Sequence, residues 1–152
     1  MTGKFCDTSV WLALAIPGHV HHQLARAWLD SLDEPESAIF CRATQQSLMR
    51  LLTRAAVFAT YDREPLTNEQ AWAVYDEMRE DDRVGFHANE PPGIERYWRE
   101  FSQRRTASPN VWMDAYLAAF ARAADYTLVT ADGDFRQFVG LDLVTLAIGG
   151  AT

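Results

Sequence analysis

The sequence of 152 residues has only one lysine, two cysteines and no long apolar run. Two cysteines cannot build a disulfide-rich scaffold, so Cys6 and Cys41 are expected to be reduced thiols. No stretch of about 18 apolar residues occurs, which argues against a membrane-spanning helix. The segment before Asp7 lacks a charged region followed by a long apolar one, so no secretory signal is expected. These absences favour a cytoplasmic protein, with secretion by a signal-independent route left open.

The charge is unbalanced toward acid, with a formal net charge of −7. Broad, non-specific nucleic-acid binding depends on neutralising phosphates, so this balance argues against it while leaving a specific nucleic-acid substrate open. Every basic residue except Lys4 is an arginine. Arginine suits bidentate contacts to phosphate.

Several common catalytic motifs are missing, among them G-x-x-x-x-G-K-[ST], H-E-x-x-H and G-x-S-x-G. His19, His21 and His22 stand together, but no cysteine or fourth ligand lies near them, which argues against a zinc site. A phosphoryl-transfer domain with an aspartyl nucleophile is also disfavoured. Ser9 stands where such phosphatases need a second acid, and Lys4 lies at the wrong end of the first predicted strand.

Short apolar segments alternate with segments of helical periodicity. The expected strands are residues 4–6, 38–41, 84–86, 126–130 and 143–148, and the tail 149–152 is expected to fray. The expected helices are residues 8–16, 21–32, 42–53, 68–80, 94–105 and 110–124. This alternation predicts an α/β fold, a parallel β-sheet flanked by helices on both faces, in a single domain spanning residues 1–152.

Three acidic residues occupy similar junctions. Asp7 ends the first strand, Asp132 follows the strand that ends at Thr130, and Asp114 lies one turn into the last helix. That helix is apolar almost all the way round, so it is expected to be buried, and a carboxylate in it needs a compensating partner. Ligands in such folds lie beyond the carboxyl ends of the strands. We therefore expect the three carboxylates to meet there and hold a divalent metal.

Each of these residues also has a simpler explanation. Asp7 could cap the helix that follows it, and a turn explains Asp132 and Asp134, which flank Gly133. Thr130 could be an ordinary strand residue. The metal hypothesis therefore depends on the set. Magnesium and manganese favour oxygen ligands and keep several waters, so a few carboxylates suffice, and a metal-activated water would hydrolyse a phosphodiester without a serine or cysteine nucleophile.

Three motifs connect the chain to a known family. Asp7-Thr-Ser-Val-Trp-Leu, Met113-Asp-Ala-Tyr-Leu-Ala-Ala and Val129-Thr-Ala-Asp-Gly-Asp-Phe135 resemble the corresponding segments of the PIN-domain ribonucleases. More narrowly, the chain resembles the VapC toxins of bacterial type II toxin–antitoxin modules. Each motif is short, but their order, spacing and total length cover nearly the whole chain.

The resemblance implies a magnesium-dependent endoribonuclease toxin, with manganese as a possible substitute, on a PIN-like α/β/α sandwich. It also implies a homodimer and a cognate VapB-type antitoxin that occupies the active-site groove. By motif position Asp7 and Asp114 would be the principal metal ligands. Asp132 would be the later acid and Asp134 an accessory one. Thr8, Ser9 and Thr130 would be hydroxyls lining the site.

One departure from the family pattern concerns the helix after the second strand, where the family usually has a glutamate. Residues 42–50 contain no acid, so Gln45, Gln46 or Ser47 stands near the usual position. Arg42 and Arg50 on the same helix could contact phosphate. Together with Ser9, Arg42, Gln45, Gln46 and Arg50 form the predicted substrate-binding set. The missing glutamate keeps a second hypothesis open, in which a weak or inactive PIN-like module binds RNA or the antitoxin without cutting.

Overall fold

A five-stranded parallel sheet forms the middle layer of the computed structural model, which describes residues 3–147. The strands are β1 (Lys4–Cys6), β2 (Ala38–Phe40), β3 (Val84–Phe86), β4 (Thr127–Thr130) and β5 (Leu143–Thr145). They lie in the order β3-β2-β1-β4-β5, and every neighbouring pair is parallel. The central strands are short, almost continuous apolar runs, as expected of strands covered on both faces.

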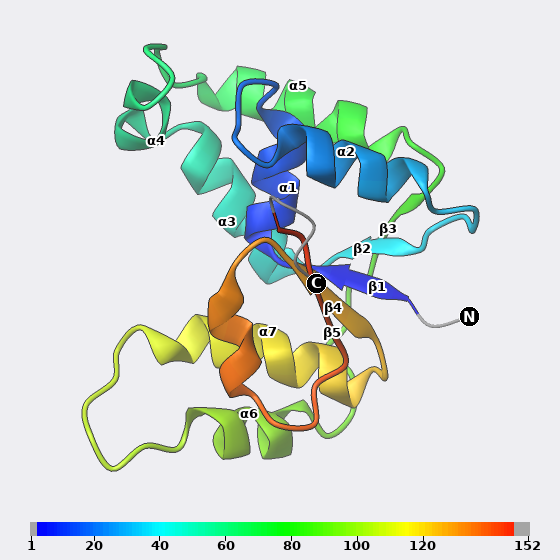
Figure 1. Ribbon diagram of the computed structural model, residues 1–152, viewed down its shortest axis with the longest axis vertical. Coiled ribbons are helices and arrows are strands. Elements are labelled where there is room, and N and C mark those ends of the chain that lie inside the picture. Colours follow the sequence, from blue (N-terminus) through cyan, green and yellow to red (C-terminus); the bar gives the residue numbers. More distant parts are fainter. Residues whose placement is uncertain (1–2, 148–152) are drawn as a thin grey trace.

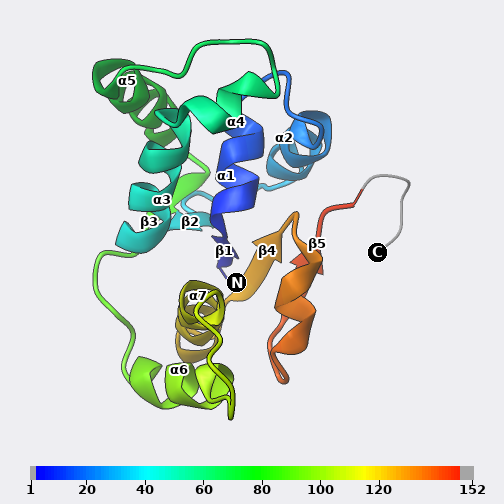
Figure 2. The same cartoon turned by 90° about the vertical axis from the view of Figure 1, so that its left-hand side faces the viewer.

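Helices cover both faces of this sheet, which confirms the predicted fold class (Figures 1 and 2). One layer contains α1 (Thr8–Ala15), α2 (His22–Asp30), α3 (Arg42–Leu52), α4 (Ala55–Ala59) and α5 (Asn68–Arg79). The opposite layer contains α6 (Ile94–Ser102) and α7 (Val111–Ala123). A 3₁₀ helix, η1 (Gly133–Gln137), connects β4 to the segment before β5.

Side chains that alternate along the strands build a separate core on each face. Cys6, Phe40 and Val129 pack with α1, α3 and α5, and the Phe40 ring stacks on Trp11 with centroids 3.7 Å apart. Phe5 points to the other face and stacks on Phe120 of α7, with centroids 4.7 Å apart. β2 therefore makes an aromatic stack with one helical layer, and β1 makes one with the opposite layer.

Several element ends differ from the sequence prediction. The short helix α4 was not predicted, and α6 ends at Ser102 rather than Arg105. The Ser102 hydroxyl donates to the carbonyl of Trp98 (2.6 Å), and Gln103 is extended, so the chain leaves the helix there. β5 ends at Thr145, and the described residues 146–147 are not strand as predicted; Ile148 and the tail 149–152 lie outside the described residues.

The prediction of a fully buried helix was wrong for the first turn of α7. Residues from Ala115 to Ala121 are mostly buried, but Trp112 and Met113 are 54% and 47% exposed. Length explains the difference. A helix of 13 residues is about 20 Å long, whereas β4 has four residues and spans about 13 Å. The start of α7 therefore extends past the carboxyl edge of the sheet.

An arginine fork fastens the end of α2 to the loop before β3. Arg83 donates to both carboxylate oxygens of Asp81 (3.0 and 2.8 Å), to the carbonyl of Leu29 (2.9 Å) and to Asp30 (3.1 Å). These hydrogen bonds from Arg83 hold the pKa of Asp81 at about 2, below its usual value. The fork thus connects α2 to the loop between α5 and β3.

The lowered pKa of Asp81 predicts a pH-dependent stability. A carboxylate with a lower pKa in the folded than in the unfolded state stabilises the fold above about pH 4, and this contribution is lost as the pH falls toward 2. Because water reaches the pair, we expect Asp81→Asn to reduce the free energy of unfolding by only about 1 kcal/mol at pH 7. The difference from wild type should shrink between pH 4 and pH 2 in urea titrations. Asp82→Asn, at the exposed neighbouring position, is the control and should show neither effect.

Candidate metal centre at the carboxyl edge of the sheet

The strand order places β1 and β4 side by side although 120 residues separate them in the chain. The chain runs outward from β1 through β2 to β3 and then returns to the other side of β1 for β4 and β5. Crevices that bind ligands form at such reversals, beyond the carboxyl ends of the strands. Cys6 pairs with Val129, and the amide of Asp7 donates to the Val129 carbonyl (3.0 Å). Asp7 is therefore positioned beside Thr130 at the reversal.

Asp7 is the most buried acidic residue of this edge, with 4% of its surface exposed. Its carboxylate accepts hydrogen bonds from the Ser9 hydroxyl (2.5 Å), the Thr130 hydroxyl (2.6 Å) and the backbone amide of Val10 (3.3 Å). The last contact caps α1, so the capping role considered from the sequence is present. Burial nevertheless raises the pKa of Asp7 to about 6, against these three donors, and the charge of Asp132 adds to the increase.

Two hydroxyl groups fasten the β1–α1 junction to the turn after β4. Besides donating to Asp7, the Thr130 hydroxyl accepts from the amide of Asp132 (2.9 Å). The Ser9 hydroxyl accepts from the amide of Ala131 (2.9 Å). Ser9 and Thr130 therefore do more than line the edge: they set the position of the turn that carries Asp132.

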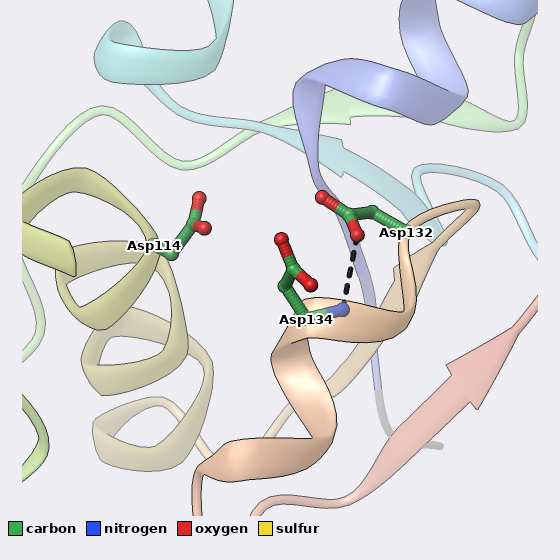
Figure 3. Close-up of side chains that lie close together, drawn as sticks. All are labelled: Asp114, Asp132 and Asp134. Atoms are coloured by element: carbon green, nitrogen blue, oxygen red, sulfur yellow. Dashed lines mark hydrogen bonds between the residues drawn. The ribbon is translucent and has the colours of Figure 1, made fainter. Parts of the chain in front are cut away.

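Three carboxylates face one another beside this junction (Figure 3). Carboxylate oxygens of Asp114, Asp132 and Asp134 all lie within 4.8 Å of one another. Asp132 accepts from the amide of Asp134 (3.0 Å) and so caps η1, which places both acids at the start of that helix. Asp114 comes from the first turn of α7. Burial raises the pKa of Asp114, and the charges of Asp132 and Asp134 raise it further.

This donor set fits a hard divalent cation. Carboxylate oxygens are the ligands that Mg²⁺ and Mn²⁺ favour, and a cation would relieve the repulsion that raises the pKa of Asp114. Within residues 3–147 no other group of three acidic, histidine or cysteine side chains is arranged in this way. Asp7 is not one of this trio; its carboxylate accepts hydrogen bonds from Ser9, Thr130 and Val10, and these three donors leave it an acceptor position for an ion.

The predicted substrate-binding residues of α3 line a depression of their own. Side chains of α3 and α5 line a depression of about 440 Å³, and Arg42, Gln45, Gln46, Arg50 and Trp72 are among them. Gln45 is buried and accepts from the Arg42 guanidinium (2.5 Å), which also lies over the Phe86 ring (4.7 Å). These four polar residues line one depression, and the acidic trio is not part of its wall. Their contact with RNA stays a prediction.

One connection to the site was not predicted from the sequence. Arg104, in the loop after α6, donates to the side-chain oxygen of Gln137 in η1 (2.6 Å). Gln137 in turn donates to the backbone carbonyl of Asp134 (2.9 Å). The chain Arg104–Gln137–Asp134 couples the α6–α7 loop to the acid-bearing turn. Only the folded chain brings these segments together, so no local pattern could indicate it.

The fold and the acidic edge together are those of a PIN domain. The PIN domain family matches residues 4–141, so the chain belongs to that family. Within this family, the chain is 53% identical to Ribonuclease VapC41 of Mycobacterium tuberculosis over 142 residues. The aligned region covers 93% of this chain and 97% of that relative. The chain therefore belongs to the VapC group of PIN-domain proteins, as the motifs predicted.

Solved structures share the fold at low sequence identity. The M. tuberculosis toxin VapC20, described as cleaving the sarcin–ricin loop, superposes with a TM-score of 0.61 at 20% identity, over 92% of this chain and 98% of that one. DNA-bound VapBC from Salmonella typhimurium gives a TM-score of 0.64 at 13% identity, over 96% and 99%. In the described part of this chain, no helix has the length and apolar character needed to cross a bilayer.

The bridging role of Thr130 gives a testable expectation. Thr130→Val removes the donor to Asp7 and the acceptor for the amide of Asp132, so we expect about 2 kcal/mol lower stability and about tenfold slower RNA cleavage. Thr127→Val is the matched control on the same strand, because its hydroxyl donates to a carboxylate outside the site, that of Asp142 (2.8 Å). Urea unfolding and RNA cleavage rates are measured for both variants. Equal losses of cleavage rate in Thr130→Val and Thr127→Val would contradict a role specific to Thr130.

Proposed function

We propose that this protein is a divalent-metal-dependent endoribonuclease that acts as the toxin of a toxin–antitoxin pair, and that residues 1–152 act as one PIN domain. The observation that carries the proposal is the convergence of Asp114, Asp132 and Asp134 within 4.8 Å, beside buried Asp7. The 53% identity to a VapC ribonuclease over nearly the whole chain supports RNA as the substrate. Hydrolysis would leave a 5′-phosphate and a 3′-hydroxyl.

The side chains have separable tasks in this proposal. Asp7 and Asp114 are the principal ligands of Mg²⁺, or of Mn²⁺ in its place. Asp132 orients the attacking water or contributes to a second ion, and Asp134 is an accessory acid. Thr130 and Ser9 hold Asp7 and the β4 turn in register through the hydrogen bonds described above. The bound ion supplies positive charge against the scissile phosphate and makes water more acidic.

The test is cleavage of total cellular RNA by the purified protein, with Mg²⁺ or Mn²⁺ compared against a chelator. We expect discrete cleavage products with either metal and none with the chelator. Mapping the RNA ends after brief expression without a partner would identify the sites. Intact RNA under every metal condition, with a folded protein and no bound antitoxin, would reject the proposal.

The same outcome would favour the alternative, a catalytically weak or inactive module that binds RNA or the antitoxin. Its supporting observation is that the first turns of α3 offer buried Gln45, held by Arg42, and no acid. The acidic trio argues the other way, because it draws its carboxylates from α7 and η1 and needs none from α3. We therefore favour the active nuclease.

We further propose that the toxin is a homodimer in the cytoplasm and that a cognate VapB-type antitoxin occupies its active-site groove. Structural neighbours described as VapBC complexes support such a pairing. Co-expression with the neighbouring gene product should yield a stable complex that does not cleave RNA. Light scattering on the isolated protein should give twice the chain mass, and a monomer at all concentrations would contradict the dimer.

A further inference from the structure

A pocket of about 720 Å³ opens between α6 and the loop that leads into α7. Its walls include Trp98 and Arg99 of α6, Arg104 of the loop, and Trp112 of the first turn of α7. This volume falls in the range of about 300–1,000 Å³ that is typical of sites for small organic groups. Nothing in the proposed chemistry at the acidic trio uses these residues.

The pocket combines a flat apolar wall with positive charge. Trp112 is 54% exposed, and it is held from behind by Trp98, whose ring packs edge-on at 5.9 Å and whose Nε1 donates to the Trp112 carbonyl (3.0 Å). Arg99 and Arg104 are exposed, and the loop from 103 to 110 contains two arginines and no acid. Glu95 is the acid on the rim, and its pairing with Arg99 at 3.8 Å, with both side chains more than 70% exposed, is weak.

The pocket is connected to the acidic trio in two ways. Trp112 stands two residues before Asp114 on α7, so the two side chains leave opposite sides of the same helical turn. Arg104 forms part of the pocket wall and, through Gln137, holds the backbone of Asp134. A strand that crosses the start of α7 would therefore reach the carboxylates and the pocket within a few nucleotides.

We propose that this pocket binds an unpaired nucleobase of the RNA substrate, within a few nucleotides of the scissile phosphate. The base stacks on Trp112, and Arg99 and Arg104 contact the flanking phosphates. Single-stranded RNA is recognised by splayed bases stacking on aromatic rings, and arginines beside such a ring neutralise the backbone. The inference rests on the proposed ribonuclease function and adds a single-stranded substrate and a subsite to it.

The charge of the pocket favours RNA over a protein occupant. The chain as a whole carries a net charge of −7, so a local excess of arginine on an exposed rim is a departure from its average surface. Gln103, Thr106 and Ser108 accompany the arginines along the rim. The core of a protein–protein contact would instead be depleted of charged groups.

The experiment measures RNA binding separately from cleavage. A short single-stranded RNA carrying 2-aminopurine is titrated with full-length protein in the presence of chelator, so that the RNA stays intact. We expect quenching of the 2-aminopurine fluorescence by the wild type. Trp112→Ala should weaken binding about tenfold, and Trp112→Phe should restore most of it. Val20→Ala, which shortens another exposed apolar side chain, is the control and should bind as the wild type does.

Further measurements test the arginine contacts to phosphate and the effect of the pocket on cleavage. Arg99→Gln should reduce the salt dependence of binding by about one charge, whereas Arg96→Gln, on the same helix but outside the pocket wall, should not. With Mg²⁺ or Mn²⁺, Trp112→Ala should raise KM about tenfold and leave kcat within about twofold. Equal affinity of the wild type and Trp112→Ala overturns the inference even if RNA is cleaved.

Two outcomes distinguish the base pocket from the nuclease proposal and from a contact between two copies of the chain. Quenching with the expected variant effects but no cleavage by the wild type would reject the nuclease proposal and retain the base pocket. A smaller particle mass for Trp112→Ala in light scattering, with RNA affinity unchanged, would assign the pocket to a contact between two copies of the chain and overturn the inference.

Discussion

Replacing Asp114 by asparagine is expected to lower RNA cleavage at least about a hundredfold while the protein stays folded, since substitutions in the groups that merely support a metal site cost 10–100-fold. The substitution replaces one carboxylate oxygen by an NH2 group and keeps the shape of the side chain. It removes the charge that converges with Asp132 and Asp134 within 4.8 Å. The loss should appear in kcat/KM with Mg²⁺ and with Mn²⁺.

The same substitution should not destabilise the metal-free protein. Asp114 has no hydrogen-bond donor among the described side chains, and burial, Asp132 and Asp134 all raise its pKa. A neutral amide relieves that repulsion, so the free energy of unfolding in chelator should equal or exceed that of the wild type. Added Mn²⁺ should raise the Tm of the wild type, by linkage to the folded state, and raise that of Asp114→Asn much less.

Asp33→Asn supplies a matched control, because Asp33 is an exposed loop carboxylate on the opposite edge of the sheet. It should leave the cleavage rate and the Mn²⁺ response unchanged. Full metal-dependent activity in a folded Asp114→Asn protein would remove Asp114 from the site. Equal Mn²⁺ stabilisation of the wild type and the variant would show that the ion binds elsewhere.

The placement of Asp7 and Asp132 was accessible from the sequence because it depends on local order. Each acid lies within two residues of the end of a short apolar strand, and parallel strands end at the same edge. Strand and helix alternation likewise predicted the sheet and its two covered faces. These inferences need no knowledge of how side chains pack, and the structure confirms the fold that they predict.

Features that depend on packing between distant elements were beyond such reasoning. The exposure of Trp112 follows from the mismatch between a long helix and short strands, which an apolar pattern alone does not reveal. The closeness of Asp134 to Asp114 depends on how η1 turns after β4. The hydrogen bond from Arg104 in the loop after α6 to Gln137 in η1 joins two residues that are 33 positions apart in the chain.

The two parts of the acidic edge have different physical characters. Asp7 is buried and surrounded by donors, so it is already a structural element of the β1–β4 junction. Asp114, Asp132 and Asp134 are more exposed and repel one another. A cation would relieve the repulsion among the three carboxylates of the second group. Substitutions of Asp7 and of the trio should therefore change the free energy of unfolding differently, even where they lower the cleavage rate equally.

Asp7 provides the sharpest test of this distinction, because it has both a capping and a proposed catalytic role. Asn is as good an N-cap as Asp, whereas Ala is a poor one. We expect Asp7→Asn and Asp7→Ala to lose cleavage to a similar extent, at least about a hundredfold. Asp7→Ala should also be less stable than Asp7→Asn by about 1 kcal/mol, since it leaves the amide of Val10 without its partner.

Urea unfolding and cleavage assays on the two variants separate the roles. If Asp7 only caps α1, Asp7→Asn would keep both the helix and the activity, and only Asp7→Ala would be impaired. If the charge of Asp7 is needed, the activities fall together while the stabilities diverge. The second pattern is expected, because the fold keeps a carboxylate at this buried position although burial raises its pKa to about 6. An uncharged capping side chain would avoid that cost of burial.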